Sequence, residues 1–132
     1  MGTSRPTRGV TLDAGALIAL EHGSGRMIAL VDEIARAGGE AYAYVPAGAL
    51  AQAWRGGRQA RIARLLRSSR SRVVPLDEPR ARAAGALLAL AGTSDVVDAT
   101  VVLCAREYAV AVVSSDRDDL VALDPALPVF AP

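Results

Sequence analysis

Apolar residues along the chain fall into two alternating kinds of segment. Short runs rich in Val, Ala, Tyr and Leu are bounded by Gly, Pro or charged residues, which is the pattern of buried β-strands. Between these runs lie longer segments in which apolar positions recur at helical spacing. The predicted strands cover residues 9–13, 41–45, 72–76, 109–114 and 128–130. The predicted helices cover residues 14–20, 26–36, 47–55, 58–67, 77–90, 95–108 and 116–123.

Strands that alternate with helices at these spacings predict βαβ units and therefore a parallel sheet covered by helices on both faces. Cap residues support the boundaries, since Gly38 and Gly39 end one helix, and Asp77 and Pro79 begin another. We expect an α/β fold with a central sheet of about four to five strands. The chain is predicted to form a single domain over residues 1–132, with residues 1–8 as a flexible tail.

Composition agrees with one domain and excludes several other classes of protein. Apolar residues make up 52% of the 132 residues and aromatic residues only 4%, so Ala, Val, Leu and Ile must build the core. The single cysteine, Cys104, excludes an intramolecular disulfide and favours the reducing cytoplasm. No apolar run reaches the roughly 18 to 20 residues of a membrane span, and the amino-terminal residues do not have the pattern of a signal peptide.

Positive charge is concentrated in one stretch. The net charge is +1, yet residues 54–72 contain seven arginines and no acid, which leaves −6 for the rest of the chain. A basic segment on an otherwise acidic molecule favours a polyanionic partner, and Arg55, Arg58 and Arg61 are candidates for contacts with RNA phosphates. The alternative is a solvated basic helix without a ligand.

Four aspartates stand at positions where a parallel sheet gathers its ligands. Asp13 ends the first predicted strand, Asp116 follows a later one, and Asp95 and Asp98 lie one turn apart at a helix start. The carboxyl ends of parallel strands meet at one edge, so these side chains could converge. Carboxylates within about 4 to 6 Å repel one another unless a cation neutralises them. All-oxygen ligands favour Mg²⁺ or Mn²⁺.

Each aspartate taken alone has a simpler interpretation. An Asp at a helix start is commonly an N-cap, and this alternative stays open for Asp95. Asp13 is harder to explain as a cap alone, because it interrupts an apolar passage where an unpaired charge is costly. The four residues together favour a metal site.

The same segments resemble the motifs of the PIN-domain family in order and spacing. They are Leu12-Asp13, Val45-Pro-Ala-Gly-Ala-Leu-Ala-Gln52, Ser94-Asp-Val-Val-Asp98-Ala99 and Ser114-Ser-Asp116-Arg-Asp118-Asp-Leu120. The resemblance implies a three-layer α/β/α fold, a divalent-metal ribonuclease activity and, for a chain of this length, a VapC-like toxin of a type II toxin–antitoxin system.

Carried over by position, the resemblance makes Asp13, Asp98 and Asp116 the catalytic and metal-binding residues. Two positions depart from the family pattern. Gln52 stands where the family usually has a glutamate, so it offers a neutral carbonyl ligand, and Asp95 is a candidate to restore the missing charge. Ala14 and Gly15 replace the hydroxyl residues that often follow the first acid.

The resulting hypothesis is a Mg²⁺- or Mn²⁺-dependent endoribonuclease that forms a homodimer and is neutralised by an antitoxin. The alternative is a catalytically impaired PIN domain that acts as an RNA- or protein-binding module because of Gln52. A response-regulator receiver, which also has an acidic pocket, is disfavoured because this chain contains no lysine to act as the switch residue.

Overall fold

The computed structural model describes residues 9–132, and the tail predicted at residues 1–8 lies outside this part of the chain. Five strands form one sheet: β1 (Gly9–Leu12), β2 (Tyr42–Pro46), β3 (Ser71–Val74), β4 (Ala111–Val113) and β5 (Val129–Phe130). The helices are α1 (Ala14–Glu21), α2 (Gly25–Ala37), α3 (Ala47–Ala53), α4 (Ala60–Arg67), α5 (Glu78–Ala91), α6 (Val96–Tyr108) and α7 (Arg117–Leu123).

The sheet is entirely parallel, and its strand order is β3-β2-β1-β4-β5. The chain builds outward from β1 to β3 and then returns to place β4 on the other side of β1. The strand order therefore reverses between β1 and β4, and in open α/β sheets ligands bind beyond the carboxyl ends of the strands at such a point. Asp13 and Ser114 immediately follow these two strands.

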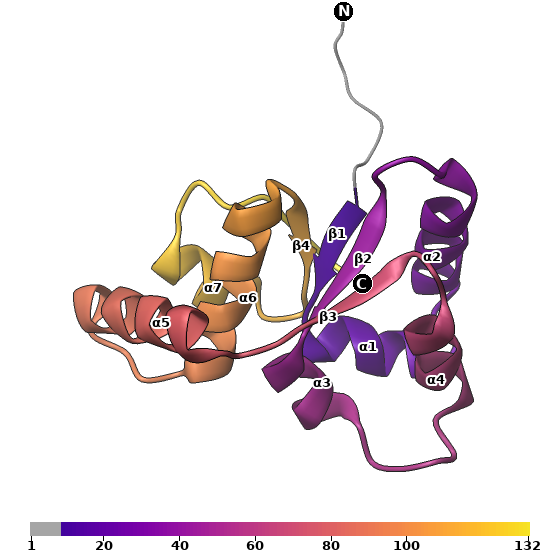
Figure 1. Ribbon diagram of the computed structural model, residues 1–132, viewed down its shortest axis with the longest axis horizontal. Coiled ribbons are helices and arrows are strands. Elements are labelled where there is room, and N and C mark those ends of the chain that lie inside the picture. The colour runs from indigo at the N-terminus through magenta and orange to yellow at the C-terminus, as the bar shows by residue number, and fades with distance from the viewer. Residues whose placement is uncertain (1–8) are drawn as a thin grey trace, which may run out of the picture.

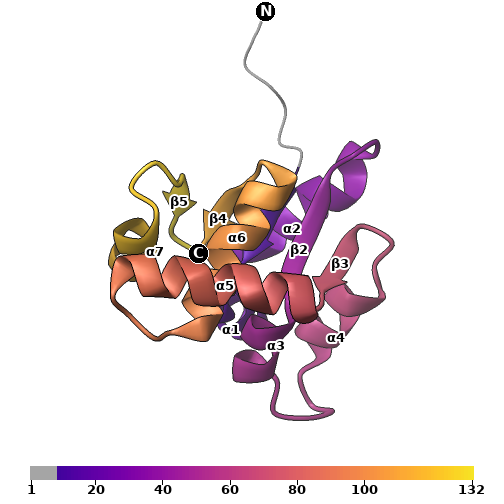
Figure 2. The same cartoon turned by 60° about the vertical axis from the view of Figure 1, so that its left-hand side comes forward.

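Helices cover both faces of the sheet, as Figure 1 shows, with α1, α2 and α4 on one side and α5, α6 and α7 on the other. The core is divided in the same way. One cluster joins β1 and β2 to α1, α2 and α4, while a second joins β4 to α3, α5, α6 and α7. In Figure 2 α5 lies across the front of α6. The predicted three-layer α/β/α architecture is confirmed.

Gly9 permits the close approach of the first two strands. Its φ is +123°, a conformation that side chains other than hydrogen rarely allow. A Cβ built at this position would lie 1.9 Å from the carbonyl oxygen of Tyr42 on β2. Only glycine therefore fits here without moving one strand away from the other.

The structure corrects the prediction between the third and fourth helices. α3 ends at Ala53 and α4 begins at Ala60, so Arg55 and Arg58 lie in the connecting segment and not on helices. Gln59 closes this segment, because its side chain accepts a hydrogen bond from the Arg55 N–H and donates one to the Ala53 carbonyl. Trp54, which begins this segment, is 37% exposed.

Among residues 9–132 no single helix is long and apolar enough to span a bilayer. The pair α5 and α6 meets the length and composition criteria only jointly, with a bend of 110° between the two helices.

Candidate functional site

Asp13 is a buried carboxylate at the junction of β1 and α1. It is 3% exposed, and its backbone N–H donates to the carbonyl of Val113, which extends the pairing of β1 with β4. One side-chain oxygen accepts a hydrogen bond from the Ala14 N–H at 2.7 Å, and the other accepts one from the Ser114 hydroxyl at 2.7 Å. These contacts fix the orientation of the carboxylate and offset part of the cost of its burial.

Ser114 links Asp13 to the turn that carries Asp116. Its hydroxyl is almost fully buried, donates to Asp13, and accepts a hydrogen bond from the Asp116 N–H at 2.9 Å. One side chain thus holds the end of β1 and the start of α7 in a fixed relation. No role for this serine was predicted from the sequence.

Asp95 and Asp98 lie at the amino-terminal end of α6. Asp95 is the N-cap, and its carboxylate accepts a hydrogen bond from the Asp98 N–H at 2.9 Å. The cap interpretation of Asp95 is therefore correct, and its second carboxylate oxygen accepts no hydrogen bond from the described residues. Asp98, in the first turn, is half-buried. A cavity of about 260 Å³ lies beside both residues and is also lined by Asp119 of α7.

The carboxylates influence one another across three elements. Burial raises the pKa of Asp98 to about 6, and the charges of Asp95, Asp13, Asp119 and Asp116, in that order, add to the increase. Burial also raises the pKa of Asp13, against the opposing hydrogen bonds from Ser114 and Ala14, and Asp116 and Asp95 contribute to the rise. The acids that the sequence predicted to converge are thus close enough to repel one another.

Asp119 joins this group although it was not among the residues predicted from the sequence. It follows Asp116 by three residues in the first turn of α7, where the helix places it one turn away. The same spacing made Asp95 and Asp98 candidates, so it could have identified Asp119 as well.

The structure places Gln52 on the expected helix, where it makes no hydrogen bond to the acids among the described residues. Gln52 is exposed in the last turn of α3 and makes no hydrogen bond to another residue in the described range. Gly48, four residues earlier and hence on the same helix face, lies against Val97 of α6, since a Cβ at Gly48 would be 3.2 Å from that side chain. This face of α3 is directed towards the helix that begins at Asp95.

The three arginines predicted to bind RNA do not share one surface role. The Arg55 guanidinium donates to the carbonyl of Trp54 at 2.8 Å, and that of Arg61 donates to the carbonyl of Glu21 at 3.0 Å. Arg61 therefore ties α4 to the end of α1. Arg58 is exposed in the connecting segment, and none of the three makes a hydrogen bond or ion pair with Asp13, Asp95, Asp98 or Asp116.

The donor set fits a divalent cation by its chemistry, although its side chains are not gathered around one point. Within residues 9–132, no three His, Cys, Asp or Glu side chains are arranged closely enough to hold an ion. The charges of the neighbouring carboxylates nevertheless favour a cation, because they add to the burial that raises the pKa of Asp98, and a bound divalent ion would relieve their repulsion.

Comparison with known proteins agrees with this architecture. The family model described as the PIN domain matches residues 10–124. No match is found among curated proteins. Among solved structures, the chain is similar to one of FitAB bound to an IR36 DNA fragment, with a TM-score of 0.61 and 20% sequence identity. The alignment covers 93% of this chain and 94% of that chain, and at this identity it shows a common fold.

Proposed function

Because the chain belongs to the PIN domain family, whose members are generally nucleases, we propose that it is a divalent-metal-dependent endoribonuclease, the toxin of a type II toxin–antitoxin pair. The observation that carries this proposal is the placement of Asp13, Asp98 and Asp116 on three elements at the edge of the sheet where the strand order reverses, where their charges add to the burial that raises the pKa of Asp13 and Asp98. Such crowding is costly in a purely structural role and useful in a cation site.

Each carboxylate has a defined part in the proposed site. Asp13, Asp98 and Asp116 would hold Mg²⁺ or Mn²⁺, with Asp95 and the neutral carbonyl of Gln52 as further ligands. When bound, the cation supplies an activated water and neutralises charge on the phosphoryl oxygens. Asp13 is oriented by Ser114 and the Ala14 N–H, so its position is fixed before any substrate arrives. Asp98 must lose its proton to act as a ligand, and its raised pKa sets the pH above which it is deprotonated.

The proposed partners follow from the resemblance to VapC-like toxins. They are an RNA substrate, an antitoxin that covers or enters the acidic groove, and a second copy of this chain in a homodimer. We also propose that the protein acts in the cytoplasm, which is compatible with the free and buried thiol of Cys104. Exposed Arg58 remains a candidate for phosphate contact, because its guanidinium has no partner among the described residues.

Cleavage of a structured RNA by purified protein tests this proposal. The parent should cleave when Mg²⁺ or Mn²⁺ is added and stop when EDTA removes it. Asp98→Asn should lose at least a hundredfold in rate and keep its circular dichroism spectrum, because it deletes one ligand without changing shape. Asp32→Asn, the same change at an exposed position of α2, is the matched control and should retain full activity. Equal cleavage by Asp98→Asn and the parent at equal metal would contradict the site.

A second candidate function rests on Gln52, which gives the site one carboxylate fewer than the family pattern. In that case the protein is a catalytically impaired PIN domain that binds RNA or protein. It would then bind RNA without cleaving it, and metal titration would give no saturable signal.

A further inference from the structure

Two arginines and three tyrosines gather at the opposite end of the sheet from the acids. Tyr42 begins β2, Tyr44 lies two residues further along the same strand, and Tyr108 ends α6. Arg70 precedes β3, and Arg72 lies within it. We refer to these five residues as the arginine–tyrosine cluster.

The rings and guanidinium groups of the cluster are in direct contact. The guanidinium carbon of Arg72 lies 4.3 Å from the centre of the Tyr42 ring, and that of Arg70 lies 5.4 Å from it. Tyr44 stacks on Tyr108 with ring centres 4.0 Å apart and planes inclined by 12°. The Tyr42 and Tyr44 ring centres are 6.0 Å apart with planes inclined by 50°, so the three rings form an aromatic layer beside the two charges in which Tyr44 is buried and Tyr42 and Tyr108 are partly exposed.

The two positive charges of the cluster are not neutralised within the described part of the chain. None of the ion pairs among residues 9–132 includes Arg70 or Arg72. Glu107, the acid next to Tyr108, is held by Arg80, whose guanidinium donates to both of its oxygens at 2.9 and 3.2 Å. Arg72 is exposed, and Arg70 is partly exposed with a contact to the Gly39 carbonyl.

The cluster has room for a ligand because it lies at the edge of this sheet face. Arg72 on the edge strand β3 is exposed, and β3 pairs with β2 on one side only. On that face α6 extends from the acids at its first turn to Tyr108 at its last, about 20 Å for thirteen residues. The cluster is thus a surface separate from the acidic site, on the same face of the sheet.

We propose that the arginine–tyrosine cluster binds a single-stranded segment of RNA outside the acidic site. The guanidinium laid against the Tyr42 ring is held ready to stack with a base, and both arginines can contact phosphates. An acidic peptide would satisfy the charges but would make no use of the aromatic layer. The inference rests on the proposed function only for the identity of the nucleic acid as RNA.

Binding of a fluorescent twelve-nucleotide oligouridine in EDTA tests the inference without any cleavage. Arg70→Gln with Arg72→Gln should weaken binding about tenfold and reduce the slope of log affinity against log salt by about 0.7 for each phosphate interaction that the substitutions remove. Tyr42→Leu should weaken binding about fivefold or more with little change in the slope, because it removes stacking and no charge. Tyr42→Phe keeps the ring and should bind like the parent.

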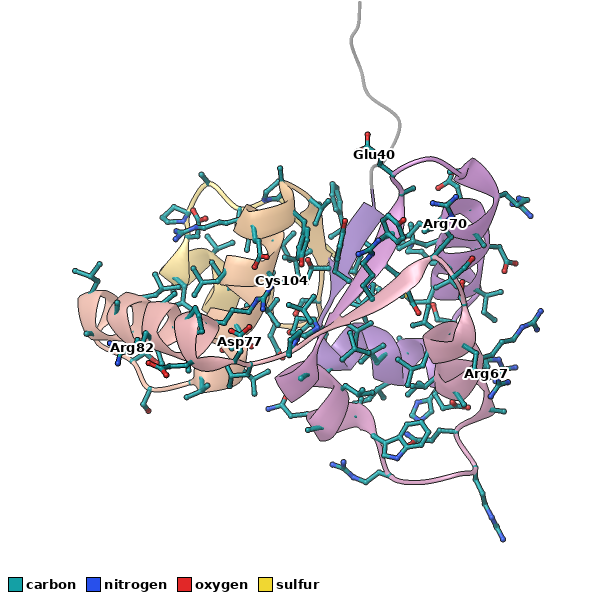
Figure 3. All side chains as sticks on the ribbon, in the orientation of Figure 1. Glu40, Arg67, Arg70, Asp77, Arg82 and Cys104 are labelled. Carbon is teal, nitrogen blue, oxygen red and sulfur yellow. The ribbon has the colours of Figure 1, made fainter. Side chains whose placement is uncertain are left out.

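Arg82→Gln is the matched control for the loss of one positive charge, and its affinity for the oligouridine is compared with that of the single variant Arg72→Gln. Arg82 is exposed on α5, pairs with Glu78, and lies on the far side of the molecule from Arg70 in Figure 3. It should bind within twofold of the parent. An RNA duplex should bind more weakly than the single strand to the parent, since its bases are not free to stack.

Parent-like binding by both the double arginine variant and Tyr42→Leu would overturn the inference and leave the cluster as a structural link between β2 and β3. Equal affinity for duplex and single strand would overturn it as well. Should a variant fail to fold, crosslinking of 4-thiouridine RNA to the parent decides: crosslinks at Tyr42 or Tyr108 support the inference, and their absence overturns it. If the parent cleaves RNA and the variants bind RNA as the parent does, the arginine–tyrosine cluster is rejected as a binding surface and the proposed function stands. If the parent binds RNA, the variants bind it more weakly, and the parent does not cleave it, the proposed function is rejected and the binding surface stands.

Discussion

Asp13 and Asp98 are carboxylates of the same site in different surroundings. Asp13 is buried and already has hydrogen-bond donors on both oxygens, so its position is set by the fold. Asp98 is half-buried and accepts no hydrogen bond from another described residue. Its pKa is raised by burial and by the charges of four neighbouring carboxylates. The sequence predicted both residues, because an acid that directly follows an apolar strand or begins an apolar helix is conspicuous. It could not predict Ser114 as the partner of Asp13, since that contact joins positions 101 residues apart.

The raised pKa of Asp98 predicts a particular pH dependence of stability in the absence of metal. Between its unfolded value of 3.8 and its folded value of about 6, the folded state binds more protons, so this group lowers stability as pH rises through that window. The rise of the pKa from 3.8 to about 6 corresponds to about 3 kcal/mol, which solvent screening reduces to about 1 kcal/mol. Urea unfolding in EDTA should find Asp98→Asn about 1 kcal/mol more stable than the parent at pH 7.5 and equal to it near pH 4. A constant difference at both pH values would contradict the raised pKa of Asp98.

The neutral side chain of Gln52 gives a second prediction at the residue scale. If Gln52 faces the cation, Gln52→Glu should raise Mn²⁺ affinity tenfold or more, about 1.4 kcal/mol, because it adds a fourth carboxylate. If Asp95 already supplies that charge, the gain should be small in the parent and large in an Asp95→Asn background, since neighbouring ligands couple. Metal titration of the four variants measures this cycle. No gain in either background would mean that Gln52 does not face the metal.

At the scale of elements, the helix and strand positions were predictable and the details at their ends were less so. Asp77 caps α5 with Pro79 in its first turn, as expected, and Gly38 ends α2. These ends depend on local chemistry that the sequence displays. The α3–α4 connection was misplaced because its ends depend on the Gln59 side chain folding back on Ala53, a contact that periodicity does not encode.

The Ser114 hydroxyl, which follows β4, connects Asp13 to the Asp116 N–H at the start of α7, and its removal gives a prediction for stability. Ser114→Ala removes a donor to Asp13 and an acceptor for the Asp116 N–H, so it should destabilise the protein by about 1 to 3 kcal/mol at pH 7. The loss should be smaller near pH 4, where Asp13 is closer to neutral and needs its donor less. Ser115→Ala, at the exposed neighbour, is the control and should change stability by less than about 0.5 kcal/mol. Equal losses for the two variants in urea unfolding would show that the Ser114 bridge contributes nothing specific.

At the scale of the whole molecule, the parallel sheet brings together residues that are far apart in the sequence. The acids occupy positions 13, 95, 98, 116 and 119, and they lie at the same edge of the sheet because β4 returns to the side of β1. Their placement at this edge was predictable from the alternation of strands and helices, whereas their arrangement around one ion stays a prediction. The distribution of the basic residues was less predictable: Arg55 and Arg58 were predicted on helices but lie in the α3–α4 connection, while Arg61, Arg64 and Arg67 lie on α4, Arg70 precedes β3 and Arg72 lies within it.

The central claim is that these carboxylates form a divalent cation site, and isothermal titration with Mn²⁺ tests it most directly. The parent should show saturable binding at pH 7.5 that weakens below pH 6, where Asp98 regains its proton, with proton release visible as a dependence of the heat on the buffer. Asp98→Asn should bind at least tenfold more weakly at pH 7.5, while the exposed Asp32→Asn should match the parent. Absence of saturable binding by the parent, or equal affinity of the parent and Asp98→Asn, would contradict the account.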